Sequence, residues 1–126
     1  MSIEGDVAKR VLVVEDNELN MKLFCDLLRA HAFETEGVRD GREAMARARA
    51  FQPDLIITDI QLPHMTGHEL IAQLKADLVL GSIPILAVTA YASRADEERI
   101  RAAGANAYLS KPIALMPFVA QVKALL

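Results

Sequence analysis

The chain has 126 residues, 52% of them hydrophobic, with 14 basic and 17 acidic side chains and a formal net charge of -3. This length suits one domain with one core. The basic residues form no cluster, which excludes the electrostatic footprint of a nucleic-acid binder. The single cysteine, Cys25, cannot form an internal disulfide, and no apolar run is long enough for a signal peptide or a membrane span. The composition therefore predicts a soluble cytoplasmic protein without nucleic-acid or membrane partners.

The first half of the chain alternates strand and helix patterns. Residues 11–14 form a short β-branched run, which is typical of a strand covered on both faces. The helix that follows has Asp16 or Asn17 as a suitable N-cap. Its apolar face is predicted to consist of Leu19, Leu23, Phe24, Leu27 and Leu28. A weak strand over 33–38 and an Ala-rich helix over 41–50 come next.

The second half repeats this alternation, with strands predicted over 54–59, 83–89 and 107–110 and a helix over 68–76. A polar helix has Ser93 as its cap and Gly104 as its stop. The stripe of the last helix is predicted to be Leu115, Phe118, Val119, Val122 and Leu126. Five strands alternating with five helices predict an α/β, doubly wound, flavodoxin-like fold. Its parallel sheet has the order 2-1-3-4-5, with helices on both faces. No linker or repeat calls for a second domain.

Polar side chains gather where the predicted strands end. The first strand ends in Glu15 and Asp16, the third in Asp59, the fourth in Thr89 and the fifth in Lys111, whereas the second offers nothing comparable. Each residue alone has an ordinary interpretation, such as an N-cap, a turn initiator or a solvated lysine. Ligands of such sheets bind at the carboxyl ends of the strands, however, where these residues would meet. Their coincidence at one edge favours a functional site.

Three converging carboxylates need compensation, because two like charges ~4 Å apart at an effective dielectric of about 20 repel by about 4 kcal/mol. Lys111 offsets part of this repulsion. A hard divalent cation with oxygen ligands, most simply Mg²⁺, would offset the rest, and the lack of Cys or His at this edge disfavours zinc. With the metal on Asp16 and Asp59, a free carboxylate oxygen of Asp59 can attack phosphorus to give an aspartyl phosphate. Lys111 and the Thr89 hydroxyl would then help to neutralise and align the phosphoryl group.

The segments "VVEDN", "DLIITDIQLPHMTG", "AVTA" and "YLSKP" together resemble a response-regulator receiver domain of the CheY-like superfamily. The resemblance covers 9–126 and leaves 1–8 as an N-terminal tail. It implies that Asp59 is the phosphoacceptor, that Thr89 contacts the phosphoryl group and that Lys111 binds it. It also implies a cis peptide bond between Lys111 and Pro112 and an aromatic switch at Tyr108.

The resemblance further implies a set of Mg²⁺ ligands. These are Asp16, Asp59 and the backbone carbonyl of Gln61, with Glu15 acting through water. Glu15 stands where many members of the family have Asp, and its extra methylene shifts the outer carboxylate. Direct metal contact is therefore expected from Asp16.

By the same resemblance the chain is a single-domain response regulator of a two-component phosphorelay, and not an enzyme beyond slow self-dephosphorylation. The expected partners are a histidine kinase or histidine phosphotransfer protein and a downstream kinase or adaptor, and the protein is expected to be a monomer. Its closest resemblance within the family is to bacterial cell-cycle and division regulators. A chemotaxis-type output and a phosphate-relay or phosphate-sink role are the alternatives.

Three rival functions fit the sequence less well. A flavodoxin-like redox enzyme would need a phosphate-cradling loop where the chain has "EDNELN". A haloacid-dehalogenase-type phosphatase would need a second Asp two positions after Asp59. A phosphorylation-independent scaffold would not need the intact acceptor set. The histidines His31, His64 and His68 are interpreted as solvated side chains, and Cys25 as a packed thiol.

Overall fold

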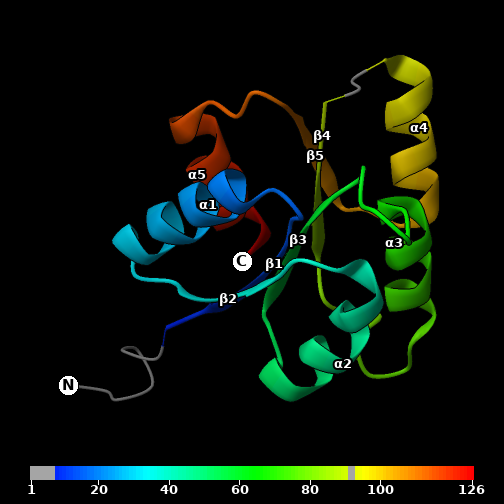
Figure 1. The fold of residues 1–126 in the computed structure, drawn as a ribbon, viewed down its shortest axis with the longest axis horizontal. Helices are drawn as coiled ribbons and strands as arrows, with labels where there is room; N and C mark the ends of the chain where they lie inside the picture. Colours follow the sequence, from blue (N-terminus) through cyan, green and yellow to red (C-terminus); the bar gives the residue numbers. More distant parts are fainter. Residues whose placement is uncertain (1–7, 91–92) are drawn as a thin grey trace.

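The computed structural model describes residues 8–90 and 93–126, and in this part of the chain five strands alternate with five helices (Figure 1). The strands are β1 (Arg10–Val14), β2 (Glu34–Val38), β3 (Leu55–Asp59), β4 (Ile85–Thr89) and β5 (Ala107–Ser110). The helices are α1 (Glu18–Ala30), α2 (Gly41–Phe51), α3 (Gly67–Ala76), α4 (Arg94–Ala103) and α5 (Leu115–Leu125). All neighbouring strands are parallel, in the order β2-β1-β3-β4-β5. The predicted fold class and strand order are confirmed, whereas residues 1–7 of the predicted tail lie outside the described residues.

The sheet lies between two layers of helices. In Figure 1, α1 and α5 cover one face, and α2, α3 and α4 cover the other. Successive residues of a strand point to opposite faces, so Val11 and Val13 pack under α1 and α5, whereas Leu12 and Val14 pack on the other side. Both faces are covered, which is why the central strands are mainly aliphatic up to their carboxyl ends.

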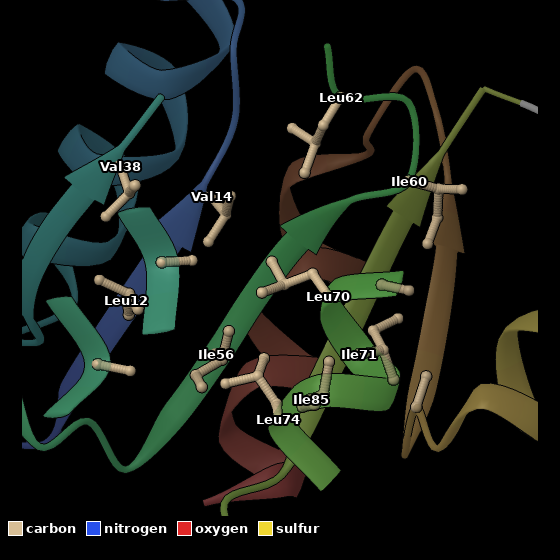
Figure 2. Close-up of a cluster of buried hydrophobic side chains, with 14 of the residues drawn as sticks. Leu12, Val14, Val38, Ile56, Ile60, Leu62, Leu70, Ile71, Leu74 and Ile85 are labelled. Carbon is tan, nitrogen blue, oxygen red and sulfur yellow. The ribbon is translucent and has the colours of Figure 1, made fainter. Parts of the chain in front are cut away.

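The larger cluster lies between the sheet and α2, α3 and α4. Leu70, Ile71 and Leu74 of α3 lie against Ile56 of β3 and Ile85 of β4 (Figure 2). Each such side chain, once buried, stabilises the fold by about 1.5–3 kcal/mol relative to exposure. This packing makes the sheet a rigid support for the residues at its carboxyl edge.

No helix among the described residues is long and apolar enough to cross a membrane.

The predicted helix ends agree with the structure. The side chain of Asn17 accepts a hydrogen bond from the Asn20 amide and caps α1, which decides between the two candidate caps. Ser93 caps α4, and Gly104 ends that helix with a φ of 121°. Thr66 and Glu69 form a capping box at the start of α3.

The predicted apolar face of α1 is wrong at its first turns. Leu19 and Leu23 are 79% and 45% exposed, whereas the buried stripe runs through Phe24, Cys25 and Leu28. Phe24 stacks on Phe118 of α5 with ring centroids 5.3 Å apart, and this contact turns the stripe toward α5. Leu19 and Leu23 belong to an equally regular apolar spacing that does not face the sheet. The packed thiol predicted at Cys25 is confirmed.

A similar correction applies to α5. Phe118, Val119 and Val122 are buried as predicted, but Leu115 in the first turn is exposed. Its neighbour Met116 is exposed as well. The first turns of both α1 and α5 therefore present large apolar side chains on the outside of the molecule.

Candidate functional site

The register of the sheet brings the predicted carboxylates together. Val14 of β1 lies opposite Thr58 of β3, so Glu15 and Asp59, which come next, emerge side by side. Glu15, Asp16 and Asp59 each offer a carboxylate oxygen, and these oxygens lie within 4.8 Å of one another. Glu15 is 1% and Asp59 is 4% exposed. The sequence thus places two buried acidic side chains and one half-buried one at a single point.

Lys111 joins two of these carboxylates. Its Nζ donates to Oε1 of Glu15 at 2.9 Å and to Oδ2 of Asp59 at 2.8 Å. Burial alone would lower the pKa of the Lys111 ammonium, but the hydrogen bonds to Asp59 and Glu15 outweigh it and raise the pKa above its usual value. Lys111 therefore stays charged and offsets part of the negative charge of the cluster.

Glu15 has both carboxylate oxygens engaged. Oε1 accepts from Lys111, and Oε2 accepts from the backbone N–H of Asn17 at 3.1 Å. Burial raises the pKa of the Glu15 carboxyl, and the hydrogen bonds from Lys111 and Asn17 only partly oppose this rise. By contrast, the Asp16 carboxylate accepts no hydrogen bond from any residue in 8–90 or 93–126. Of the two side chains after β1, Asp16 is the one with oxygens available to a ligand.

Asp59 is held at the end of β3 by its neighbours. Its Oδ1 accepts from the backbone N–H of Gln61 at 3.1 Å, and its Oδ2 accepts from Lys111. The start of α3 closes against it, because a Cβ at Gly67 would lie 2.5 Å from the backbone oxygen of Asp59. The close approach of α3 to the site therefore requires a glycine at this position.

Thr89 lies at the end of β4 and is buried. Its backbone oxygen accepts from the Lys111 amide at 2.7 Å, which fixes the start of the Lys111 segment beside β4. Asp16, Gln61 and Thr89 together line one side of a cavity of about 500 Å³. The peptide bond between Lys111 and Pro112 is cis, as the resemblance implied.

Tyr108 does not reach the carboxylates in this structure. It is half-buried on β5, where its ring lies 5.8 Å from the Arg101 guanidinium of α4. Its hydroxyl donates to the Glu97 carboxylate, and this hydrogen bond raises the pKa of Tyr108. Arg101 in turn donates to Glu97 at 3.0 Å. Tyr108 therefore joins β5 to α4.

No site residue was expected after β2, and the structure adds one contact from there to the Asp16 backbone. Arg39, the residue after β2, donates from its guanidinium to the backbone oxygen of Asp16 at 3.2 Å. The sequence carried a signal for this contact, because β2 adjoins β1 and an arginine directly follows its last residue. An arginine in a predicted loop is commonly solvated, however, so the signal is weak.

The three histidines differ from one another. His64 is exposed, as predicted. His31 and His68 are half-buried, which corrects their interpretation as solvated side chains. The Nε2 of His68 is buried without a hydrogen-bond partner among the described residues, and burial lowers the pKa of its imidazole. None of the three belongs to the acidic cluster.

The chemistry of the cluster suits a hard cation. It offers only carboxylate oxygens, it holds more negative than positive charge, and no thiolate or imidazole is part of it. A metal ion that binds oxygen therefore fits these residues.

Comparison with known proteins agrees with this geometry. Residues 11–123 match the model of the response regulator receiver domain. The chain therefore belongs to the response-regulator receiver domain family and is a signalling protein. Membership in this family implies interaction with histidine kinases or phosphotransfer proteins.

Among curated relatives, the chain is similar to the polar-differentiation response regulators DivK of Brucella ovis and Brucella anthropi. It is 52% identical to the first over 120 residues, which are 95% of this chain and 98% of the relative. It is 52% identical to the second over 118 residues, or 94% and 96% of the two chains.

Among solved structures, the chain resembles the chemotaxis protein CheY4 of Vibrio cholerae, with a TM-score of 0.90 and 29% identity over 95% of this chain and 100% of that one. It also resembles a putative response regulator of Chloroflexus aurantiacus, with a TM-score of 0.90 and 28% identity over 94% and 98%. Both likenesses agree with the strand order found here.

Proposed function

We propose that this protein is a phosphorelay receiver that accepts a phosphoryl group on Asp59 from a phosphohistidine, with Mg²⁺ as cofactor. The observation that carries the proposal is the position of Asp59. It is a buried carboxylate beside two other acidic groups, with the Lys111 ammonium 2.8 Å from its Oδ2. A carboxylate so placed is a nucleophile with its charge compensation already in position.

The metal ligands are Asp16, Asp59 and the backbone carbonyl of Gln61, and Glu15 acts through water. Glu15 and Asp59 each have both oxygens engaged by Lys111 and a backbone amide, so a metal ion on Asp59 would share an oxygen with one of these donors. The carboxylate of Asp16 has no such partner among the described residues. When bound, Mg²⁺ supplies positive charge to phosphoryl oxygens and so lowers the barrier to transfer.

In the transfer step, an oxygen of Asp59 forms a bond to phosphorus while the P–N bond of the donor phosphohistidine breaks. The electron pair of that bond returns to the imidazole nitrogen of the donor. Lys111 moves its hydrogen bond from Asp59 to a phosphoryl oxygen, and the Thr89 hydroxyl donates to another. Slow attack of water on the aspartyl phosphate then returns the protein to its resting state.

The phosphodonor docks where α1 and α5 begin. Leu19 and Leu23 of α1, and Leu115 and Met116 of α5, are large exposed apolar side chains in the first turns of the two helices. Leu23 and Lys111 both line a cavity of about 450 Å³, so the cavity reaches from one of these side chains to the charged cluster. Exposed apolar side chains in one region are typical of a protein interface.

The signal leaves through the face formed by α4, β5 and α5. Phosphorylation draws the Thr89 hydroxyl toward the phosphoryl group, which frees space for the Tyr108 ring to turn inward. This movement costs the hydrogen bond to Glu97 and the contact with Arg101, so the two arrangements of Tyr108 are alternatives that the phosphoryl group biases. The output partner is a downstream kinase or adaptor. The similarity to DivK regulators favours a role in cell-cycle or division control for a cytoplasmic monomer.

The deciding experiment is phosphorylation by acetyl phosphate, followed by intact-mass measurement. Wild type should gain about 80 Da, the mass of one phosphoryl group, only when Mg²⁺ is present. Asp59→Asn should gain nothing and remain folded. Asp26→Asn is the matched control, because Asp26 is an exposed carboxylate on α1 that pairs with Lys22, and it should be labelled like wild type. An adduct on Asp59→Asn would contradict the assignment, and an unlabelled wild type would favour a phosphorylation-independent scaffold.

A further inference from the structure

The connection between β1 and α1, which carries Glu15 and Asp16, is attached to the end of β2 by two hydrogen bonds. The backbone N–H of Glu15 donates to the oxygen of Val38 at 3.0 Å. The Arg39 guanidinium donates to the oxygen of Asp16 at 3.2 Å. The first bond continues the pairing of the sheet, whereas the second depends on one side chain.

Arg39 fixes one end of a peptide group whose other end is also fixed. The oxygen of Asp16 and the N–H of Asn17 belong to the same peptide group. Arg39 donates to the oxygen, and Oε2 of Glu15 accepts from the N–H at 3.1 Å. The plane of this peptide group determines the backbone angles on both sides of it, and hence the direction in which the Asp16 side chain leaves the chain.

Within the described part of the chain, the bond to Asp16 is the polar contact that holds the Arg39 side chain. Among residues 8–90 and 93–126 it forms no ion pair, and its bond to Asp16 is its one side-chain hydrogen bond. Its neighbours are arranged differently. Asp40 caps α2 through the Arg42 amide, and the Arg42 side chain pairs with Asp40 at 2.7 Å. Two arginines close in sequence thus have separate tasks, one on Asp16 and one on Asp40.

We propose that Arg39 is a positioning residue that holds Asp16 in place as a cation ligand. This inference rests on the proposed function, because it assigns Arg39 a role in the same metal site. Arg39 acts through the Asp16 peptide group and does not contact the reacting atoms.

A charge effect and a positioning effect predict opposite changes in Mg²⁺ affinity when the Arg39 side chain is removed. A positive charge near an acidic cluster opposes cation binding, so its loss should tighten binding if charge alone matters. If Arg39 positions Asp16, its loss should weaken binding despite the more negative surroundings. The sign of the change therefore separates the two roles without any measurement of phosphorylation.

The test is a titration of the unphosphorylated protein with Mg²⁺. The backbone NMR signals of Asp16, Asn17 and Gln61 report the binding. Arg39→Ala should weaken Mg²⁺ binding about three- to tenfold, the range expected for one lost hydrogen bond. Arg39→Gln keeps N–H donors without the charge and should bind between wild type and Arg39→Ala. Arg42→Ala is the matched control. It removes an equal charge from the same segment and should bind Mg²⁺ as tightly as wild type or slightly more tightly.

Two negative results have different meanings. If Arg39→Ala and Arg39→Gln both bind Mg²⁺ as tightly as wild type or more tightly, Arg39 acts only through its charge, and the positioning role is wrong. If wild type itself shows no Mg²⁺-dependent shift at Asp16, Asn17 or Gln61, the proposed metal site is wrong. Signals of β4 residues, far from Arg39 in the sheet order, report in each variant whether the fold is intact.

Discussion

Two lysines at opposite ends of the sheet show how burial can serve chemistry or structure. Lys111 at the carboxyl edge donates to the carboxylates of Glu15 and Asp59. Lys75 of α3, toward the amino edge, donates to neutral oxygens, those of Gly81, Ile83 and the Asn106 side chain. Hydrogen bonds to acids raise the pKa of Lys111 against the effect of burial, whereas burial lowers the pKa of Lys75.

The two sites differ in the charge that remains after each ammonium group has formed its hydrogen bonds. The oxygens around Lys75 belong to a closed structural contact, because Asn106 also accepts from the Ile85 amide and Gly104 packs directly on the Lys75 side chain. A Cβ at Gly104 would lie 2.5 Å from Cγ of Lys75. Around Lys111, three acidic side chains lie together, and the Lys111 ammonium forms ion pairs with two of them. The excess negative charge at the carboxyl edge can be neutralised by a bound cation. The neutral oxygens around Lys75 are already paired with donors and offer no site for a ligand.

The largest expected effect is at Lys111. Lys111→Ala should slow phosphorylation by acetyl phosphate about 100-fold or more, because it removes charge stabilisation from the phosphoryl group in the transition state. Mg²⁺ should bind at least as tightly as in wild type, since the acidic cluster loses its compensating charge. Metal titration and the rate of mass increase measure the two effects separately. Loss of Mg²⁺ affinity with normal phosphorylation would instead make Lys111 a structural residue like Lys75.

A substitution at Lys75 should have the opposite pattern, with an effect on stability and none on phosphorylation. Lys75→Met should lower the free energy of unfolding by about 1 kcal/mol, because it leaves the partly buried oxygens of Gly81 and Ile83 without their donor. Phosphorylation should proceed at the wild-type rate. Urea unfolding measures the loss, and Lys22→Met, at an exposed ion pair on α1, should change stability by less than about 0.5 kcal/mol. A stability loss no larger than that of the Lys22 variant would mean that the Lys75 contacts are not structural.

Most of the carboxyl edge could be predicted from the sequence, because parallel strands end at one edge and their last residues can be aligned without knowing the packing. Glu15, Asp59 and Lys111 meet for this reason, through backbone register. Contacts that depend on side-chain direction could not be predicted. Arg39 reaches a backbone oxygen, and its position directly after β2 is only a weak signal for that contact.

The orientation of the helices was the second feature that could not be predicted from the sequence. The spacing of Leu19 and Leu23 is as helical as that of Phe24 and Leu28, and only the contact with Phe118 decides which set faces the core. The contact of Lys75 with Asn106, 31 positions away in sequence, likewise requires knowledge of the tertiary structure. Local signals specified the elements and their caps, whereas contacts between distant elements set which faces are buried.

A smaller effect is expected on output. Thr89→Ala keeps Asp59 and Lys111, so it should still accept phosphate, but partner binding should respond less to a beryllofluoride mimic than in wild type. In wild type the mimic with Mg²⁺ should shift backbone signals over 93–101 and around Tyr108, which lies against Arg101. NMR and a partner-binding titration measure these responses. If all shifts stay within the Asp59 loop and partner affinity is unchanged, the protein acts as a phosphate relay or sink.

The smallest expected effect is on the pH dependence of stability and involves Asp77, a carboxylate at the amino edge of the sheet. The backbone N–H groups of Leu80 and Val79 donate to Asp77, and together with Arg49 they lower the pKa of its carboxyl below the usual 3.8. Burial raises the pKa of Glu15 at the other edge, so the two carboxylates respond oppositely to the fold.

Because the pKa of Asp77 is lower in the folded state than in the unfolded state, its contribution to stability is present above about pH 4 and is lost as the pH falls below that value. Between pH 5 and pH 3, wild type should therefore lose more unfolding free energy than Asp77→Asn, whose amide cannot be protonated in this range. Urea unfolding at the two pH values measures the difference between the proteins, so acid effects of the other carboxylates cancel. Equal losses in both proteins would mean that the loop after α3 does not depend on the Asp77 charge.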